Sequence, residues 1–228
     1  MKKGIYFISG IDTDSGKTYG TGLVGRFLHK KNQDVITMKL VQTGCSGFPD
    51  DLVKHRELMG VSHHEVDRKN MTCPYVFKFP ASPHLAASLE NTSIDINKID
   101  AWTEKLAKRF DYLLIEGAGG LHVPLTLDYT LLDYLKDRKY PVILVTSSRI
   151  GSINHTLLSF EAIKSRGLEL AGVLYNHYPI ENQFVLDDSK KVFKHYLDSW
   201  FPDTPLIEMP FVRKNAIPDL PLDKVFGL

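Results

Sequence analysis

The stretch GIDTDSGKTY, residues 10–19, fits the phosphate-loop pattern G-x-x-x-x-G-K-[ST]. In this pattern, backbone N–H groups at the start of a helix converge on phosphate oxygens, and glycines allow the close approach. Lys17 is predicted to reach the β- and γ-phosphates, and the Thr18 hydroxyl to ligate Mg²⁺. Because the pattern follows a predicted strand and opens a predicted helix, we expect a nucleotide site. Kinases, molecular switches and ligases all use such a loop.

Two acidic residues stand where they could hold a cation. Glu116 lies in the apolar run YLLIEGAGG (112–120), and a carboxylate at the end of a buried strand is costly unless it meets a cation. Mg²⁺ is such a cation, because it prefers oxygen ligands. Asp51 opens a predicted helix and could be a second ligand, or it could be a first-turn acid that only interacts with the helix dipole. The neighbouring Asp50 is an alternative to it.

Two further segments with suitable residues end predicted strands. Lys39, in MKLVQTG (38–44), could be a solvated cap or could hold a second anionic group beside the phosphate loop. In RIGSINH (149–155), Gly151 and Ser152 could leave free N–H groups at the start of a helix, which would suit a carboxylate. The alternative is that Ser152 only caps the helix.

The elements that must position these residues alternate along the chain. Runs such as YLLI and VILV are apolar without alternation, which is typical of strands covered on both faces. Strands that alternate with longer helices predict an α/β fold with a doubly wound, mostly parallel sheet and helices on both faces. Ligands bind such sheets at the carboxyl ends of the strands, where every motif above falls. The predicted strands are 5–9, 35–40, 112–120, 142–148, 170–176 and 205–211, and the predicted helices are 18–31, 50–60, 93–110 with Asp95 as its cap, 152–165 and 182–200.

Length and composition restrict the classes of partner. The 228 residues suit one large domain spanning 1–228, and the net charge of +1 offers no surface for nucleic acid or an anionic membrane. No stretch approaches the roughly 20 apolar residues of a membrane span, and the apolar run after Met1 is too short for a signal peptide. Cys45 and Cys73 lack a C-x-x-C context and are expected to be reduced thiols. We therefore expect a cytoplasmic protein.

In their order along the chain, these segments resemble the dethiobiotin synthetase family. The resemblance rests on GIDTDSGKT, KLVQTG, ASPH (81–84), IEGAGG, PVILV, IGSINH, AGVLYN and EMPF, and it covers most of the chain. It implies a P-loop NTPase fold and a ligase that converts 7,8-diaminopelargonate, CO₂ and ATP to dethiobiotin with Mg²⁺. It also implies a carbamate, a carbamic–phosphoric anhydride, and a homodimer with shared active sites, in which the start of the GSINH helix reaches the neighbouring subunit's substrate.

The resemblance implies roles for individual residues. Lys17 and Lys39 are expected to be catalytic, because they would stabilise the transferring phosphoryl group and the carbamate. The expected metal ligands are Thr18, Asp51 and Glu116. The expected substrate-binding residues are Thr13, Thr43, Ser152, Ile153 and Asn154. The expected nucleotide-binding residues are Asp14, Ser15, Gly16, Lys17, Thr18, Tyr19, Asp51, Glu116, Gly117, Ala118, Gly119, Asn176, His177, Pro210, Phe211 and Val212.

Three positions depart from the family pattern. Leu40 stands where proline commonly follows the strand-end lysine, which affects only the shape of the loop. His177 stands where an aspartate often follows the base-reading asparagine. Ile217 occupies a place where some members have an acidic nucleotide contact. The last two departures bear on adenine selectivity and leave the expected chemistry unchanged.

The main alternative is a switch ATPase of the partitioning or septum-positioning type, whose fold is related. Such proteins carry a lysine at the second position of the loop, where this chain has Ile11. They also tend to have a surface for membrane or DNA, which the net charge does not offer. A small-molecule kinase would usually show an arginine-rich lid, and the sequence has no arginine cluster. The ordered motifs therefore favour the synthetase.

Overall fold

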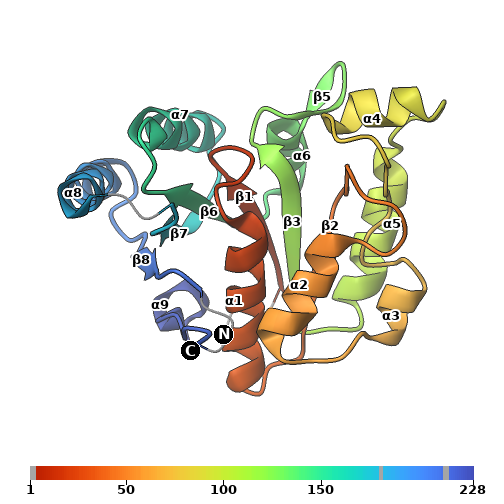
Figure 1. Cartoon of the computed structure of the whole chain (residues 1–228), viewed down its shortest axis with the longest axis horizontal. Coiled ribbons are helices and arrows are strands. Elements are labelled where there is room, and N and C mark those ends of the chain that lie inside the picture. Colours follow the sequence, from red (N-terminus) through yellow and green to blue (C-terminus); the bar gives the residue numbers. More distant parts are fainter. Residues whose placement is uncertain (1–3, 180–181, 213–215) are drawn as a thin grey trace.

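The centre of the fold is a six-stranded sheet, seen in Figure 1 with helices in front of it and behind it. The computed structural model describes residues 4–179, 182–212 and 216–228. The strand order is β2-β3-β1-β6-β7-β8, and all neighbouring strands are parallel. The strands are β1 (Gly4–Gly10), β2 (Val35–Lys39), β3 (Tyr112–Gly120), β6 (Val142–Ser147), β7 (Leu170–Asn176) and β8 (Leu206–Met209).

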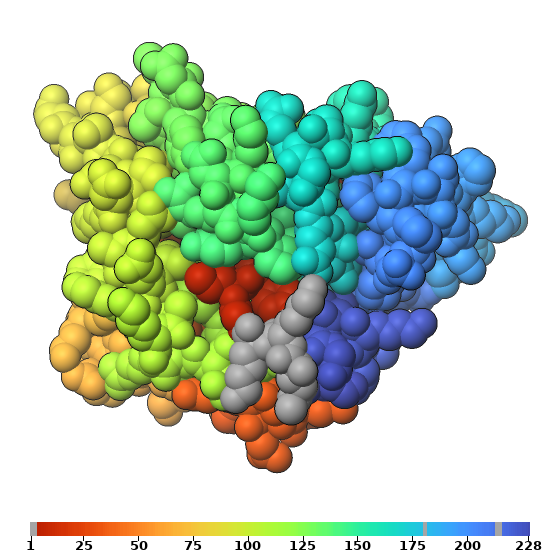
Figure 2. Space-filling model, turned by 180° about the vertical axis from the view of Figure 1, so that it is seen from behind, coloured from red at the N-terminus to blue at the C-terminus, as the bar shows by residue number. Residues whose placement is uncertain are grey.

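Helices cover both faces of this sheet, which confirms the predicted doubly wound α/β class. The face seen in Figure 1 is covered by α1 (Lys17–Lys30), with α2 (Asp50–Met59) beside it and α9 (Asp223–Phe226) near the C-terminus. In Figure 2, the opposite face shows α5, α7 and α8 and the segment around α6, side by side. The helices on that face are α4 (Pro83–Leu89), α5 (Ile96–Ala107), α6 (Leu131–Arg138), α7 (Ser152–Ser165) and α8 (Gln183–Trp200).

The strands bury side chains on both faces, which explains their continuous apolar runs. In β1, Tyr6 and Ile8 belong to the core under α1, whereas Phe7 belongs to the core under α5 to α8. In β3, Leu114 belongs to the core under α1 and Leu113 to the core under α5 to α8. Because successive strand residues point to opposite faces, a strand covered on both sides needs apolar residues at every position.

Six short elements were not predicted from the sequence. They are α3 (Glu65–Arg68), α4, α6, α9 and the hairpin of β4 (Pro124–Thr126) with β5 (Tyr129–Thr130). Of these, α6 carried a readable signal, because Thr130 caps it by accepting from the backbone N–H of Asp133 at 3.2 Å. The predicted cap of the 93–110 helix is confirmed, since Asp95 accepts from the N–H of Asn97 at 2.9 Å. The helix itself begins at Ile96 and ends at Ala107.

Two further expectations concern cysteines and membranes. Cys45 and Cys73 are both free and buried, and burial raises the pKa of the Cys73 thiol to about 12. Among the helices of the described residues, none combines the length and apolarity that a bilayer crossing needs.

Candidate active site

A cleft of about 1290 Å³ opens at the carboxyl ends of β1, β2 and β3, where ligands of parallel sheets bind. Its walls come from the phosphate loop, the end of β2, the start of α2, the glycine segment of β3 and the segments after β7 and β8. The expected site residues that line it are Thr13, Asp14, Gly16, Lys17, Thr18, Tyr19, Lys39, Thr43, Asp51, Glu116, Ala118, Gly119, Asn176, Phe211 and Val212. The expected residues outside its lining are Ser15, Gly117, Ser152, Ile153, Asn154, His177 and Pro210.

The phosphate loop joins β1 to α1 and is anchored to the end of β7. Gly16 has a φ of 98°, in the left-handed region, and a Cβ there would lie 2.4 Å from Nδ2 of Asn176. The same Nδ2 donates to the carbonyl of Ser15 at 3.0 Å. No side chain caps the start of α1, so its first N–H groups can bind a phosphate. Only glycine fits at position 16, which explains the loop's requirement for it.

Lys17 is the buried cation of the loop. Its side chain is 6% exposed, and its Nζ donates to the carbonyl of Asp12 at 2.8 Å. Burial, together with the nearby charge of Lys39, lowers the pKa of Lys17 to about 8. An ammonium held in this way would be stabilised by an incoming phosphate, because the anion opposes both effects.

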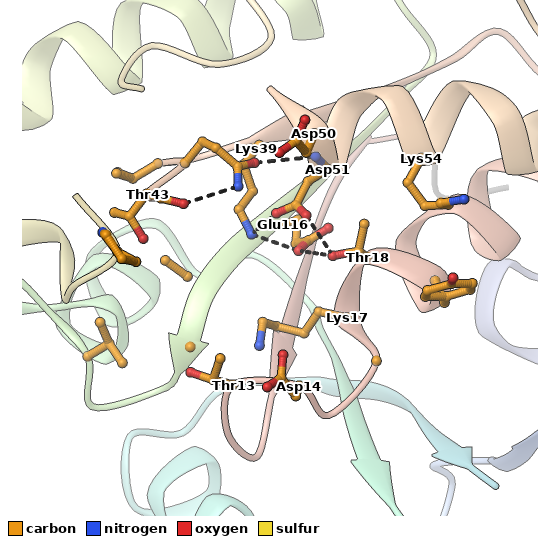
Figure 3. Close-up of a pocket in the computed structure, with 18 of the residues that line it drawn as sticks. Thr13, Asp14, Lys17, Thr18, Lys39, Thr43, Asp50, Asp51, Lys54 and Glu116 are labelled. Atoms are coloured by element: carbon orange, nitrogen blue, oxygen red, sulfur yellow. Dashed lines mark hydrogen bonds and ion pairs between the residues drawn. The ribbon is translucent and has the colours of Figure 1, made fainter. Parts of the chain in front are cut away.

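Four polar side chains, each from a different segment, converge beside the loop, as Figure 3 shows. The Thr18 hydroxyl lies 3.1 Å from Oδ1 of Asp51 and 3.1 Å from Oε1 of Glu116. Nζ of Lys39 lies 2.7 Å from Glu116 Oε1 and 2.7 Å from Asp51 Oδ2. Burial alone would raise the pKa of Glu116, but the Lys39 ammonium and a hydrogen bond from His55 hold it well below its usual range.

The charge of Lys39 is maintained by the same contacts. Burial alone would lower the pKa of Lys39, but the carboxylates of Glu116 and Asp51 raise it above its ordinary value. Lys39 is therefore a buried ammonium and not the solvated cap that the sequence left open. It also donates to the carbonyl of Gly117 at 3.1 Å, which ties its side chain to the backbone of β3.

The converging oxygens fit Mg²⁺. A hydroxyl and two carboxylates are hard oxygen donors, and Mg²⁺ usually combines one or two carboxylates with waters and nucleotide phosphates. Among the described residues, no group of three or more His, Cys, Asp or Glu side chains is arranged to hold a metal ion, so a metal here would need the nucleotide as well. Asp51, and not Asp50, makes the contact with Thr18. The expected metal ligands thus lie together, and their role stays a prediction.

The opposite end of the cleft is aromatic and apolar. The rings of Tyr178 and Phe211 are stacked at 5.6 Å, and both line the cleft beside Met209 and Val212. Their flat faces suit a nucleobase, since every base stacks on an aromatic ring. Tyr178 was not among the expected residues, although its aromatic side chain directly follows Asn176 and His177, which were expected to bind the nucleotide.

His177 and Ile217 lie apart from this apolar end. His177 Nε2 is 3.7 Å from Glu208, and its ring contacts that of Tyr175 at 5.3 Å. Burial and the charge of Lys190 lower the pKa of His177. Ile217 packs against the core under α1. Neither side chain lines the cleft, so their departures from the family pattern do not touch the base end directly.

We therefore expect the nucleobase preference to be insensitive to His177. In His177→Asp, the ratios of kcat/KM for ATP, CTP and GTP should stay within about twofold of the parent, because surface substitutions away from a contact have small effects. In Tyr178→Ala, KM for all three should rise about tenfold, the scale of losing one base–aromatic stack. A sharper ATP preference in His177→Asp would instead place that side chain at the base.

The start of α7 forms a separate site within one chain. Ser152, Ile153 and Asn154 follow Gly151, whose φ of 93° turns the chain into the helix. Ile153 lines a groove of about 310 Å³ between this helix start and α8, whereas Asn154 is exposed. The structure of the single chain therefore does not bring these expected substrate-binding residues to the main cleft.

Sequence reasoning missed two polar residues next to the cluster of Thr18, Lys39, Asp51 and Glu116. His55 Nε2 lies 2.6 Å from Oε2 of Glu116, and both side chains are fully buried. The signal was its position one helical turn after Asp51, which places both residues on one face of α2. Gln42 lines the cleft, and its Oε1 accepts from the N–H of Asp51 at 3.4 Å.

The parallel sheet, the loop between β1 and α1 and the carboxylate of Glu116 on the neighbouring strand β3 define a P-loop nucleotide-binding protein. A family model described as an AAA domain matches residues 5–198. The chain is 46% identical over 200 residues to ATP-dependent dethiobiotin synthetase BioD 2 of Pasteurella multocida, covering 88% of this chain and 94% of that protein.

Two further relatives carry the same activity in their names. The BioD 2 protein of Haemophilus influenzae is 51% identical over 175 residues, covering 77% of this chain and 92% of that protein. The BioD protein of Chlorobaculum tepidum is 44% identical over 219 residues, covering 96% and 92%. The chain therefore belongs to the ATP-dependent dethiobiotin synthetase family, as its ordered motifs indicated.

Proposed function

We propose that this chain carries out the ATP- and Mg²⁺-dependent carboxylation and ring closure of 7,8-diaminopelargonate to dethiobiotin. The observation that carries the proposal is the convergence of Lys17, Lys39 and the oxygens of Thr18, Asp51 and Glu116 in one cleft. Residues 1–228 would form one synthetase domain. A cytoplasmic location fits the two free thiols, which that compartment keeps reduced.

The chain's residues would act mainly by positioning and by charge. One amine of the substrate and CO₂ form a carbamate, whose oxygen attacks the γ-phosphorus of ATP while the bond to ADP breaks. The second amine then attacks the carbamate carbon, and phosphate leaves as the ring closes. Lys17 would neutralise the transferring phosphoryl group, and Lys39 would hold the carbamate beside it. Such chemistry needs little covalent help from protein.

The metal site would be formed by Thr18, Asp51 and Glu116. Mg²⁺, when bound there, would offset the negative charge of the nucleotide phosphates. The two carboxylates that now hold Lys39 would share their charge with the metal, which would leave Lys39 free to bind an anion. Thr13 and Thr43, which both line the cleft, would contact substrate or phosphate.

The fate of the carbamate oxygen tests this function. CO₂ from ¹⁸O-labelled bicarbonate supplies both carbamate oxygens, so one label should appear in the dethiobiotin carbonyl and one in the released phosphate. A switch ATPase uses water to attack the γ-phosphate, and its phosphate takes no label from bicarbonate. Mass spectrometry before the label washes into solvent distinguishes the two. Unlabelled phosphate formed in step with product would exclude the anhydride route.

We further propose that the enzyme works as a homodimer with shared sites. The residues Gly151–Asn154 do not reach the cleft of their own chain, yet they include an uncapped helix start suited to a carboxylate. Ile150, beside them, is 80% exposed, and Phe184 across the groove is 83% exposed. If a second subunit covered these side chains, the helix start of the first subunit would lie at the substrate bound by the second.

Mixing two inactive variants tests the shared site. Asn154→Ala should damage the site of the partner, whereas Lys39→Ala should damage the site of its own chain. In a heterodimer, one of the two sites regains both residues, so about half the parent activity per heterodimer is expected. Mass spectrometry of differently tagged subunits demonstrates that they exchange. Exchange without restored activity would contradict sharing.

A further inference from the structure

A buried chain of hydrogen bonds lies behind the cluster of Thr18, Lys39, Asp51 and Glu116. His55 Nε2 is 2.6 Å from Oε2 of Glu116, and His55 Nδ1 is 3.0 Å from the hydroxyl of Thr37. Nη1 of Arg56 donates to the same hydroxyl at 2.5 Å. All four side chains are at most 2% exposed. Because the four side chains are buried, each of their polar atoms depends on its protein partner.

The chain of bonds defines which nitrogen of His55 carries its hydrogen. A guanidinium can only donate, so the Thr37 hydroxyl must accept from Arg56. Its own hydrogen then points to His55 Nδ1, and among the described residues it has no other acceptor. Nδ1 therefore accepts, and the ring's N–H hydrogen is on Nε2. This N–H donates to the carboxylate of Glu116.

The donor end of this chain is firmly held. Nη2 and Nε of Arg56 bind the two oxygens of Asp67 at 2.7 and 2.9 Å, and Nη2 also donates to the carbonyl of Thr37 at 3.2 Å. The Thr72 hydroxyl donates to Asp67 at 2.7 Å. The paired guanidinium thus binds both the backbone and the side chain of β2, so the hydroxyl that orients His55 has little freedom to move.

The geometry points to His55 as a positioning residue for Glu116, which it reaches through Oε2 alone. Oε1 of the same carboxylate faces Thr18 at 3.1 Å and Lys39 at 2.7 Å. The two oxygens therefore have different partners: Oε2 is held by His55, and Oε1 faces the cleft. This inference rests on the proposed metal site, because Oε1 is the oxygen that Mg²⁺ would meet.

The anchor matters because a carboxylate can rotate about its last torsion, which is broad and has no strong preference of its own. Without a donor at Oε2, Glu116 would exchange its two oxygens and would turn toward Lys39 alone. Groups that orient a metal ligand typically change metal affinity or activity by about 10- to 100-fold when they are lost. His55 should therefore affect metal binding without touching the metal.

Mn²⁺ binding in the presence of a non-hydrolysable ATP analogue, followed by electron paramagnetic resonance, tests this inference. In His55→Leu, which removes the donor, the Mn²⁺ dissociation constant should rise about tenfold. In His55→Gln, whose amide can still donate to Oε2, it should stay within about threefold. Thr37→Val, which frees the ring to change tautomer, should also weaken Mn²⁺ binding. His29→Leu, at the exposed end of α1, is the matched control and should change nothing.

The outcomes separate this inference from the metal assignment on which it rests. Asp51→Asn should weaken Mn²⁺ binding if the proposed metal site is right. If it does so while His55→Leu and Thr37→Val bind as the parent does, the positioning role is wrong and the metal site stands. Equal losses in His55→Gln and His55→Leu would show that donation to Glu116 is not the relevant property. If Asp51→Asn also binds normally, both ideas fail. Thermal melts identify any variant that has not folded.

Discussion

A Lys17→Ala variant should lose at least about 10²-fold in kcat at saturating ATP and Mg²⁺, the scale of removing one preorganised electrostatic contact. The side chain of Lys17 is nearly buried beside the phosphate loop, and solvent therefore screens its charge only weakly. Steady-state turnover measures the loss. Lys30→Ala, which removes an exposed lysine from the same helix, should leave kcat unchanged. Near-normal turnover in Lys17→Ala would remove the residue from catalysis.

The pKa of Lys17 offers an independent measurement of the same contact. With a pKa of about 8, Lys17 is half neutral at pH 8 in the free protein. A bound polyanion favours its charged form, so ATP binding at pH 8 should take up as much as about half a proton. Near pH 6 the lysine is already charged, and its share of the uptake should disappear. Calorimetry in buffers of different ionisation heat measures this uptake. Lys17→Ala should abolish the part of the proton uptake that Lys17 contributes at pH 8.

Glu116→Ala should affect both turnover and stability. We expect kcat to fall by about 10²-fold or more, because Thr18 and Lys39 lose the oxygen on which they converge. The free energy of unfolding should fall by about 3 kcal/mol, since removing one partner strands a buried charge. Asp51 still pairs with Lys39, which keeps the loss at the lower end of the usual range.

Chemical denaturation and steady-state kinetics check the two effects of Glu116→Ala. Glu104→Ala is the matched control, because Glu104 is exposed on α5 and pairs only loosely with Lys108 at 4.0 Å. It should change the free energy of unfolding by less than about 1 kcal/mol. If Glu116→Ala were as stable as the control and fully active, the buried cluster would have no role in either property.

Much of the fold could be predicted because its signals are local. The sheet strands are recognised as continuous apolar runs, and the long helices as apolar residues at helical spacing. Each of these elements is long enough for its pattern to be read without knowledge of its neighbours. The hairpin at 124–130 and the short helices α3 and α9 carried no comparable pattern. Elements of this length are stabilised by the surface they pack on, and that surface is assembled from distant segments.

The sequence alone determined the family, the parallel α/β class and the phosphate loop. The loop can be read directly because Gly16, Lys17 and Thr18 are consecutive, and a strand–loop–helix unit positions them without outside help. The remaining motifs placed Glu116 and Lys39 on predicted strands, and parallel pairing of β2 with β3 sets the two residues side by side.

Only the tertiary structure decided the contacts between segments. It brought Asp51, and not Asp50, into contact with the Thr18 hydroxyl. It also turned His177 away from the cleft and stacked Tyr178 on Phe211. It also joined His55 to Glu116 across 61 positions of sequence. These pairings depend on how the helices pack on the sheet and on which side chains are buried. A local pattern carries no information about either, because burial and hydrogen-bond partners are properties of the assembled chain.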